Sequence, residues 1–574
     1  MAAVRLPPVG GRRAGILLAL LAIGLLGVGF GLRDPWPADE PRFALIGQDM
    51  AESGRWGLPH RGPELYAEKP PVFLWAQAAA YLLTGHTRSA FLLPSLLAGL
   101  GVLALVFDLL RRLHGRRVAW WGTAALLFTL QFTLQARTAQ IDMLLTLFTT
   151  LGLYGLIRHL VLGPAFGWYA LGGLACGLGV ITKGTGFLPW LLLLPWALAK
   201  RRGMRGLSTI PRSGRWLWGP LAFLAPILLW ALPILWLAAQ PGHEEIAAYR
   251  DDLLWRQTVV RYGNAWHHHA PFWYYLVEVV PVLWMPLTLL LPWAVPAWWR
   301  RIRRGQALPL LLLGWVVLVL LFFSLSPGKR GVYILPALPA LALALAPLLP
   351  GLLRRPDVHA WLRWLALGIA LLLLAGSLWA LSGRAGFAQR LLEQSGVAPW
   401  GWLAGVGALG LMGSLWLWRR GAFALALVLG LLWSGYGLLG YPDMDAARSG
   451  RALIERATAP LPERAELGIV GGPEQFLLQA RQHPRLAGAR AFGYRTPLAR
   501  QRADAVAWLR EAPNRWLLIQ HTDLGACLRA EGGFDAGWSN RRRWWVLDAR
   551  ALVPDCVPDP ADEEDSPLRI DDDA

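Results

Sequence analysis

Acidic and basic residues gather in two short segments that follow the first hydrophobic run of the chain. The first segment holds Asp39, Glu40 and Arg42, and the second holds Glu68 and Lys69. Arginine and lysine suit a phosphate or diphosphate group, and arginine offers it a bidentate fork. A nearby aspartate suits a general base that deprotonates an acceptor hydroxyl. These residue types, placed beside a hydrophobic run, predict chemistry on a lipid-linked substrate.

Further ionisable residues stand at the edges of later apolar runs. They are Arg137, Asp142, Lys183, Arg256, Arg261, His267, His268, His269, Lys329 and Arg330. Ionisable groups close to hydrocarbon are unfavourable unless paired, and they usually serve function. Because they come from separate segments, a polar cavity open to the outer leaflet could collect them. Simpler interpretations stay open: Asp39 or Glu40 could cap a helix, and Arg137 with Asp142 could pair at a helix end.

The composition is that of a membrane protein. Of 574 residues, 55% are hydrophobic and only 16% are charged, whereas a soluble domain carries about a quarter charged residues. Apolar runs of roughly 20 residues, long enough to cross a bilayer as helices, recur along the chain. They exclude a single-span anchor and lack the alternation of a barrel. The spans, about thirteen, are predicted at 14–32, 89–110, 118–136, 141–158, 167–182, 185–199, 216–239, 272–299, 307–325, 332–350, 361–381, 399–418 and 421–441.

The arginine pattern sets the expected orientation. Arginine-rich connectors mark the cytoplasmic side of a membrane, so the net charge of +19 is no evidence of nucleic-acid binding. The clusters lie at 111–117, 200–202, 300–304, 354–355 and 419–420. All fall on one side only if the short apolar segment 71–84 lies at the interface and does not cross. The N-terminus is then cytoplasmic, and the first loop (33–88), the long loop (240–271) and the C-terminal region face outward.

The chain ends in a polar region with its own fold. Residues 443–557 predict a small α/β domain, with strands at 467–470, 491–494, 516–520 and 544–547 and helices at 473–481 and 496–511. Residues 558–574 predict an acidic, disordered tail. Cys527 and Cys556 could form a disulfide if this domain is extracytoplasmic, and the sequence leaves both states open. In the first loop, Pro41 and Gly54 predict the start and the end of a short helix.

Five motifs, in order along residues 30–340, resemble those of one enzyme family. They are Asp39–Arg42, Tyr66–Pro71, Ala136–Met143, Leu178–Gly184 and Ser324–Pro336. The family is the GT-C glycosyltransferases that use polyprenyl-phosphate sugars. The motif set is closest to bacterial aminoarabinose transferases of lipid A and is related to protein O-mannosyltransferases. The resemblance implies a polytopic α-helical GT-C membrane domain, residues 1–442, with juxtamembrane helices.

The resemblance also implies roles for individual residues. Asp39 is the expected principal catalytic carboxylate, with Asp142 as a second acid in the same cavity. The expected substrate-binding and phosphate-binding residues are Glu40, Arg42, Lys69, Arg137, Lys183, Lys329, Arg330 and Tyr333. Glu68 and the histidines His267, His268 and His269 would supply ligands to a divalent metal such as zinc, although adjacent histidines lack helix-face ligand spacing. No other cofactor is expected.

The expected function is an inverting glycosyltransferase of a bacterial inner membrane with a periplasmic active site. Its donor would be an undecaprenyl-phosphate sugar, and its acceptor would be lipid A phosphate or another envelope glycan. Two alternatives stay open: transfer to protein hydroxyls, and a non-catalytic transporter of lipid-linked sugars. The sequence has no evident internal repeat, which weakens the transporter. It leaves the identity of the sugar open.

Overall fold

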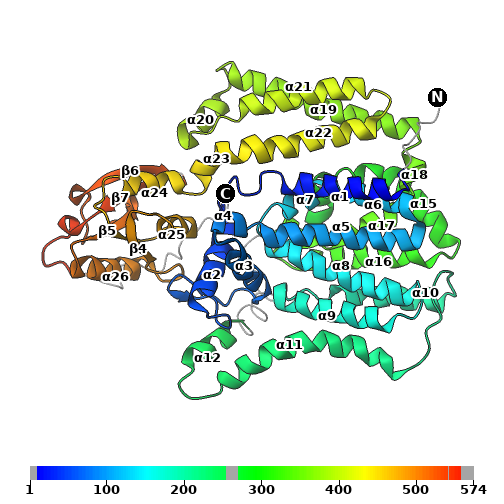
Figure 1. The fold of residues 1–574 in the computed structure, drawn as a ribbon, viewed down its shortest axis with the longest axis horizontal. Coiled ribbons are helices and arrows are strands. Elements are labelled where there is room, and N and C mark those ends of the chain that lie inside the picture. Colours follow the sequence, from blue (N-terminus) through cyan, green and yellow to red (C-terminus); the bar gives the residue numbers. More distant parts are fainter. Residues whose placement is uncertain (1–8, 254–268, 541, 558–574) are drawn as a thin grey trace.

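The computed structural model describes residues 9–253, 269–540 and 542–557. Helices form a bundle, a five-stranded sheet lies at one end of it, and α2, α3 and α4 lie between the two (Figure 1). Arg256, Arg261, His267, His268 and the predicted acidic tail fall outside the described residues.

The bundle is built mainly from α-helices. In chain order they are α1 (Arg12–Gly27), α5 (Leu93–His114), α6 (Arg116–Leu127), α7 (Leu130–Ala136), α8 (Ile141–Leu160), α9 (Phe166–Lys183), α10 (Leu193–Arg201), α11 (Trp218–Leu237), α14 (Val280–Leu283), α15 (Leu291–Arg303), α16 (Ala307–Leu325), α17 (Ala337–Leu345), α18 (Leu349–Leu352), α19 (Pro356–Leu381), α20 (Gly386–Ser395), α21 (Trp400–Trp416) and α22 (Gly421–Gly435). Short 3-10 or π segments join some of them: η1 (Leu188–Leu192), η2 (Gly214–Leu217), η4 (Tyr275–Val279), η5 (Thr288–Leu290), η6 (Gly331–Ile334) and η7 (Tyr436–Gly440).

The protein is a polytopic helical membrane protein. Six helical stretches of the described chain are long and apolar enough to cross a membrane, and a seventh arises if one bent pair counts as a single span. In the stretch Gly214–Leu237, only 6% of the apolar window is buried inside the protein. A helix with so little protein around it is suited to face lipid. The thirteen spans remain a prediction, because many of them are shorter or interrupted.

Prolines account for several of these interruptions, because proline lacks the N–H that continues a helix. The predicted span 272–299 is a bent pair, Tyr275–Leu283 and Thr288–Arg303, with 101° between its arms, and Pro286 lies at the break. The predicted span 185–199 starts as η1 around Pro189 before α10 begins. The predicted span 332–350 is divided into η6, α17 and α18. A window of apolar residues does not register these breaks.

The first loop folds against the bundle as a small helical unit. The predicted short helix is α2 (Glu40–Ser53), which ends at Gly54 with a left-handed φ of 70°. It packs against α3 (Val72–Thr84), which is followed by α4 (Thr87–Ala90). Gly47 allows this close packing, since a Cβ there would lie 2.6 Å from the Cβ of Gln77. A two-stranded hairpin, β1 (His60–Arg61) and β2 (Glu64–Leu65), completes the unit.

The C-terminal region is a mixed sheet with helices, reached through α23 (Tyr441–Arg448) and α24 (Arg451–Thr458). The strand order is β4-β3-β5-β7-β6, with β3 parallel to β4 and β5, and β7 antiparallel to β5 and β6. Its elements are β3 (Ala465–Ile469), α25 (Glu474–Arg481), β4 (Leu486–Ala491), α26 (Leu498–Glu511), β5 (Arg515–Gln520), β6 (Gly533–Ser539) and β7 (Arg542–Leu547). The sequence missed β6 and placed β4 several residues late. A disulfide joins Cys527 to Cys556.

Candidate active site

Asp39 stands immediately before α2, but its side chain does not cap that helix. Its Oδ2 accepts hydrogen bonds from Gln140 Nε2 at 3.1 Å and from Arg330 Nη2 at 3.3 Å. Gln140 precedes α8 and Arg330 precedes η6, so three segments distant in sequence meet at this carboxylate. The helix-cap interpretation of Asp39 is therefore wrong.

Asp142 and Lys183 form a second pair close to helix ends. Lys183 Nζ donates to Asp142 Oδ1 at 2.5 Å, and the same ammonium lies 4.4 Å from the ring centroid of Tyr333. Asp142 is in the first turn of α8, and Lys183 is the last residue of α9. A carboxylate at a helix start and a cation at a helix end are both favoured by the helix dipole. The suggested pairing of Asp142 with Arg137 is not what the structure shows.

Arg330 interacts electrostatically with both carboxylates, Asp39 and Asp142. Burial would lower its pKa, but the negative charges of Asp39 and Asp142, with Tyr333 nearby, raise the pKa above its ordinary value. Its side chain is still 39% exposed, against 16% for that of Asp39. Two carboxylates, a guanidinium and an ammonium thus share one polar region at the end of the bundle that carries α2.

A third cluster lies where α2 meets the C-terminal domain. Arg42 Nε donates to Glu474 Oε1 at 2.8 Å, and Arg42 Nη1 lies 3.8 Å from Glu68 Oε2. Burial would raise the pKa of Glu68, but the positive charges of Arg42, Lys69 and Arg495 outweigh it and hold this pKa below its ordinary value. Glu68 is therefore ionised at neutral pH.

Tyr66 links this cluster to Asp39. It is 2% exposed, and its pKa is raised by burial first and then by the charges of Glu68 and Asp39, against the opposing effect of Arg42. The phenol is therefore within electrostatic range of Glu68, Arg42 and Asp39. The tyrosine stays protonated and can act as a hydrogen-bond donor.

Comparison with known proteins identifies the family. A family model described as dolichyl-phosphate-mannose-protein mannosyltransferase matches residues 22–246. An undecaprenyl phosphate-alpha-4-amino-4-deoxy-L-arabinose arabinosyl transferase from Edwardsiella ictaluri is 34% identical over 418 residues, which cover 69% of this chain and 72% of that protein. The chain belongs to the GT-C glycosyltransferases that use polyprenyl-phosphate sugars. The family prediction is confirmed.

Other relatives agree with this assignment. The transferase of the same name from Pectobacterium carotovorum is 34% identical to this GT-C glycosyltransferase over 359 residues, and the match spans 61% of that relative's length. The crystal structure of ArnT from Cupriavidus metallidurans bound to undecaprenyl phosphate has a TM-score of 0.72 at 21% identity, covering 94% of this chain and 99% of that one. The same protein in the apo state gives 0.71. This GT-C glycosyltransferase therefore has an ArnT-like fold.

Three residues expected to bind phosphate have other partners in this GT-C glycosyltransferase. Glu40 is buried, ion-paired with Arg33, and accepts hydrogen bonds from the backbone amides of Trp36 and Ala139. Lys329 is 5% exposed and donates to the backbone carbonyls of Ala270 and Ser326. These contacts anchor segments of the chain, so neither residue is retained as a phosphate ligand.

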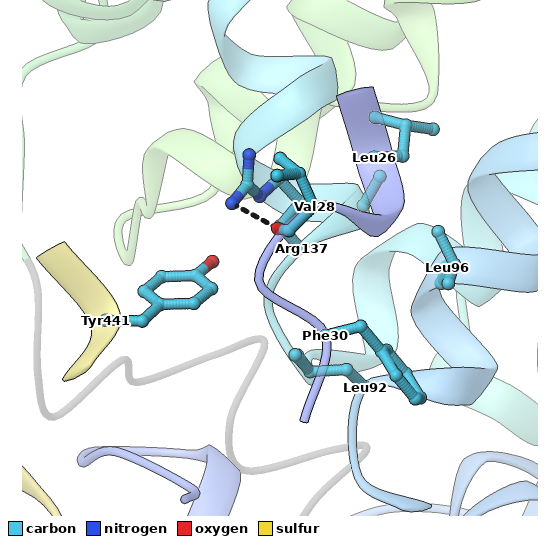
Figure 2. Close-up of a pocket in the computed structure, with 8 residues that line it drawn as sticks. Leu26, Val28, Phe30, Leu92, Leu96, Arg137 and Tyr441 are labelled. Carbon is cyan, nitrogen blue, oxygen red and sulfur yellow. Dashed lines mark hydrogen bonds between the residues drawn. The ribbon is translucent and has the colours of Figure 1, made fainter. Parts of the chain in front are cut away.

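Arg137 is the third such residue. It donates to the carbonyls of Leu25, Val28 and Trp433, and Figure 2 shows the bond to Val28. The guanidinium lies beside a small pocket that also has Tyr441 on its wall. Most of the lining is apolar, from Leu26, Val28, Phe30, Leu92, Leu96 and Ala136. Arg137 is thus committed to backbone carbonyls of two segments, the end of α1 and α22.

The predicted metal site gains no support from the part of the chain that the structure describes. No group of three or more potential ligands is found together among those residues. Glu68 is surrounded by arginine and lysine charges, which disfavour a cation. His269 forms an isolated bridge with Gly328, while the two histidines before it lie outside the described residues.

Sequence reasoning missed several residues that complete the clusters. Gln140 was overlooked although it stands two positions before Asp142. Glu474 and Arg495 come from the C-terminal domain, where no motif marks them. The sequence clue to both would have been Arg42 and Glu68 in the first loop, two charged residues that need partners of opposite charge.

Proposed function

We propose that this glycosyltransferase moves 4-amino-4-deoxy-L-arabinose from undecaprenyl phosphate to lipid A phosphate outside the cytoplasm. The proposal is carried by the meeting of Asp39 and Asp142 with Arg330 and Lys183 in one polar region. The names of the similar arabinosyl transferases support the choice of donor and sugar.

The donor phosphate would lie against Arg42, Lys69 and Lys183. Lys183 uses one of its three N–H groups on Asp142, so others remain for a phosphate oxygen. The Asp142 carboxylate would hold the ammonium in place, because it accepts from Nζ directly. Tyr333, beside that ammonium, would limit its movement.

In the transfer step, an oxygen of the acceptor attacks the anomeric carbon while the bond from that carbon to the donor phosphate oxygen breaks. The electron pair of the broken bond leaves with undecaprenyl phosphate. A singly protonated acceptor phosphate passes its proton to Asp39, whereas the dianion attacks with no proton to transfer. Arg330 would hold the Asp39 carboxylate in position, because its Nη2 donates to Oδ2. The cations stabilise charge on the departing phosphate, and preorganised electrostatic stabilisation of this kind is usually the largest contribution to catalysis.

The proposed site faces the periplasm. The disulfide Cys527–Cys556 in the C-terminal domain supports this orientation, since disulfides persist in oxidising compartments. The ends of α10 and α15 carry Lys200, Arg201, Arg300, Arg301 and Arg303. Figure 1 shows these helices at the side of the bundle away from the C-terminal sheet, which agrees with a cytoplasmic position for the basic connectors.

A second candidate function is transfer to a protein hydroxyl. It is favoured by the match of residues 22–246 to a model named for protein mannosyltransferases. The same site would serve, because Asp39 could deprotonate a serine or threonine hydroxyl. Only the acceptor and the sugar differ between the two functions.

Mass spectrometry of lipid A and of envelope glycoproteins from a deletion strain distinguishes the acceptors. We expect loss of aminoarabinose from lipid A, with complementation by the wild-type gene. In purified protein, Asp39→Asn and Lys183→Ala should abolish transfer from an undecaprenyl-phosphate sugar. Asp251→Asn, an exposed acid of α12 (Glu244–Asp251) paired with Arg250, is the matched control and should retain full turnover. Unchanged turnover of Asp39→Asn, or transport by sealed vesicles without a new glycosidic bond, would contradict the proposal.

A further inference from the structure

Two parts of the chain meet at Glu68. The carboxylate and Arg42, a residue of α2, belong to the first loop, and Arg495 belongs to the C-terminal domain. Arg495 Nη2 donates to Glu68 Oε1 at 3.1 Å, whereas Arg42 Nη1 is 3.8 Å from Glu68 Oε2. The carboxylate is therefore hydrogen-bonded to Arg495 and only within electrostatic range of Arg42.

Arg495 is itself held in place from two directions. Its backbone N–H donates to both oxygens of Glu64, at 3.1 and 2.9 Å. Its Nη1 donates to Asp252 Oδ2 at 2.8 Å. One guanidinium thus spans the first loop and the segment that follows α12. Its side chain remains 39% exposed, so it is not a core residue.

Arg42 is fixed from its other edge. Its Nε donates to Glu474 Oε1 at 2.8 Å, and the same carboxylate oxygen lies 2.5 Å from Arg61 Nη2. Glu474 is ionised, because the charges of Arg42 and Arg61 outweigh the burial that would raise its pKa. Glu474 accepts a hydrogen bond from Nε of Arg42 and not from its terminal nitrogens, Nη1 and Nη2. They are the atoms with which an arginine grips a phosphate.

An ionised carboxylate near these terminal nitrogens competes with a phosphate for them. Glu68 is such a carboxylate, and it lies less than 1 Å beyond hydrogen-bonding distance from Arg42. The hydrogen bond to Arg495 opposes the closure of Glu68 on Arg42. Without that bond, Arg42 and Glu68 could form a close pair in a region shielded from water, where such pairing is strong.

We propose that Arg495 is a positioning residue for the donor site. By holding Glu68, it leaves the terminal nitrogens of Arg42 available to the phosphate of the lipid donor. The C-terminal domain then has a definite role in donor binding. This inference rests on the proposed function, in which Arg42 contacts the donor phosphate.

The test measures the Kd of purified protein for undecaprenyl phosphate in detergent, which requires no turnover. Arg495→Ala should weaken binding roughly tenfold, the effect of losing about one good charge-assisted contact. The double variant Arg495→Ala with Glu68→Gln should bind within about twofold of wild type, because the competing carboxylate is gone. Recovery of this kind separates competition from simple undocking of the C-terminal domain.

Arg543→Ala is the matched control, since this exposed arginine of the same domain pairs with Asp535 and not with Glu68. It should bind undecaprenyl phosphate like wild type. Wild-type binding by Arg495→Ala would overturn the inference, and so would a double variant as weak as the single one. If the wild-type protein itself failed to bind undecaprenyl phosphate, the proposed function would fall and this inference with it.

Discussion

Lys183 and Asp142 form an ion pair inside a largely apolar bundle. Their side chains are 17% and 8% exposed, and they are in direct contact. A lone lysine at such a position is unfavourable by a few kcal/mol, and so is a lone carboxylate. The pair therefore contributes to folding as well as to the proposed donor site, and the two contributions can be separated by mutation.

Lys183→Ala should lower stability by about 3 kcal/mol, because it leaves the Asp142 carboxylate buried without its partner. The double variant Asp142→Asn with Lys183→Met removes both charges and should recover most of that stability. Neither variant should transfer sugar. Thermal unfolding in detergent and a transfer assay measure the two effects. A double variant that recovered turnover as well would show that the pair has no part in catalysis.

The sequence predicts which charged residues share one side of the membrane, but it does not predict which residue each of them contacts. Topology alone placed Asp39, Asp142, Lys183 and Arg330 on one side of the membrane, and the structure brings them together. It could not separate Asp39 from Glu40, because neighbouring residues at a helix start point in directions about 100° apart. One carboxylate reaches Arg330, and the other reaches Arg33.

Helix ends, rather than helix interiors, position the charged groups. Lys183 is the last residue of α9, and Gly184 terminates this helix with a left-handed φ of 75°. Gly85 terminates α3 in the same way, with a φ of 71°. A Cβ at either glycine would meet no atom within 4 Å. The conformation alone, and no steric clash, therefore demands glycine at both places.

Gly184→Ala should cost about 1–2 kcal/mol of stability, the usual penalty of a left-handed conformation for a residue with a Cβ. It should also lower turnover severalfold, because relief of that strain moves the adjacent Lys183 away from Asp142. Gly85→Ala is the matched control, with the same penalty at the end of α3, a helix that carries none of these charged residues. Unfolding temperature and initial transfer rate measure the two effects. Equal turnover in the two variants would show that the end of α9 does not control the position of Lys183.

Elements were predicted best where local signals are strong. The short helix α2 was predicted from Pro41 and Gly54, and strands β3, β5 and β7 of the C-terminal sheet from their apolar runs. Apolar windows failed where prolines divide a run, as at the bent pair around Pro286. The edge strand β6 was missed because its sequence, Gly-Phe-Asp-Ala-Gly-Trp-Ser, contains two glycines and an aspartate, which are poor strand formers.

In the whole molecule, the two ends of the bundle differ in the charged residues that they carry. One end carries the site's acids and bases and the C-terminal domain, and the other carries arginine-rich connectors, of which Arg111, Arg112 and Arg355 pair with aspartates. The connectors lie together, since Arg205 bridges to Gln306 and donates to the carbonyl of Gly305. Such a division is what the positive-inside rule produces in a protein inserted with one orientation.

Cysteine labelling in intact cells tests this orientation directly. The natural protein offers no reactive thiol, because Cys176 is buried and Cys527 is bonded to Cys556. Single substitutions Ser382→Cys, in the loop after α19, and Ser213→Cys, before α11, place exposed thiols at the two predicted sides.

A membrane-impermeant maleimide should label Ser382→Cys in intact cells and should label Ser213→Cys only after the membrane is opened. This result is expected because an odd number of crossings separates the two loops in the predicted topology. The reverse pattern would place Asp39 and Lys183 in the cytoplasm, where neither lipid A on the periplasmic face nor an exported protein could serve as acceptor. Labelling of both sites in intact cells would require an even number of crossings between them, and the proposed arrangement of helices would have to change.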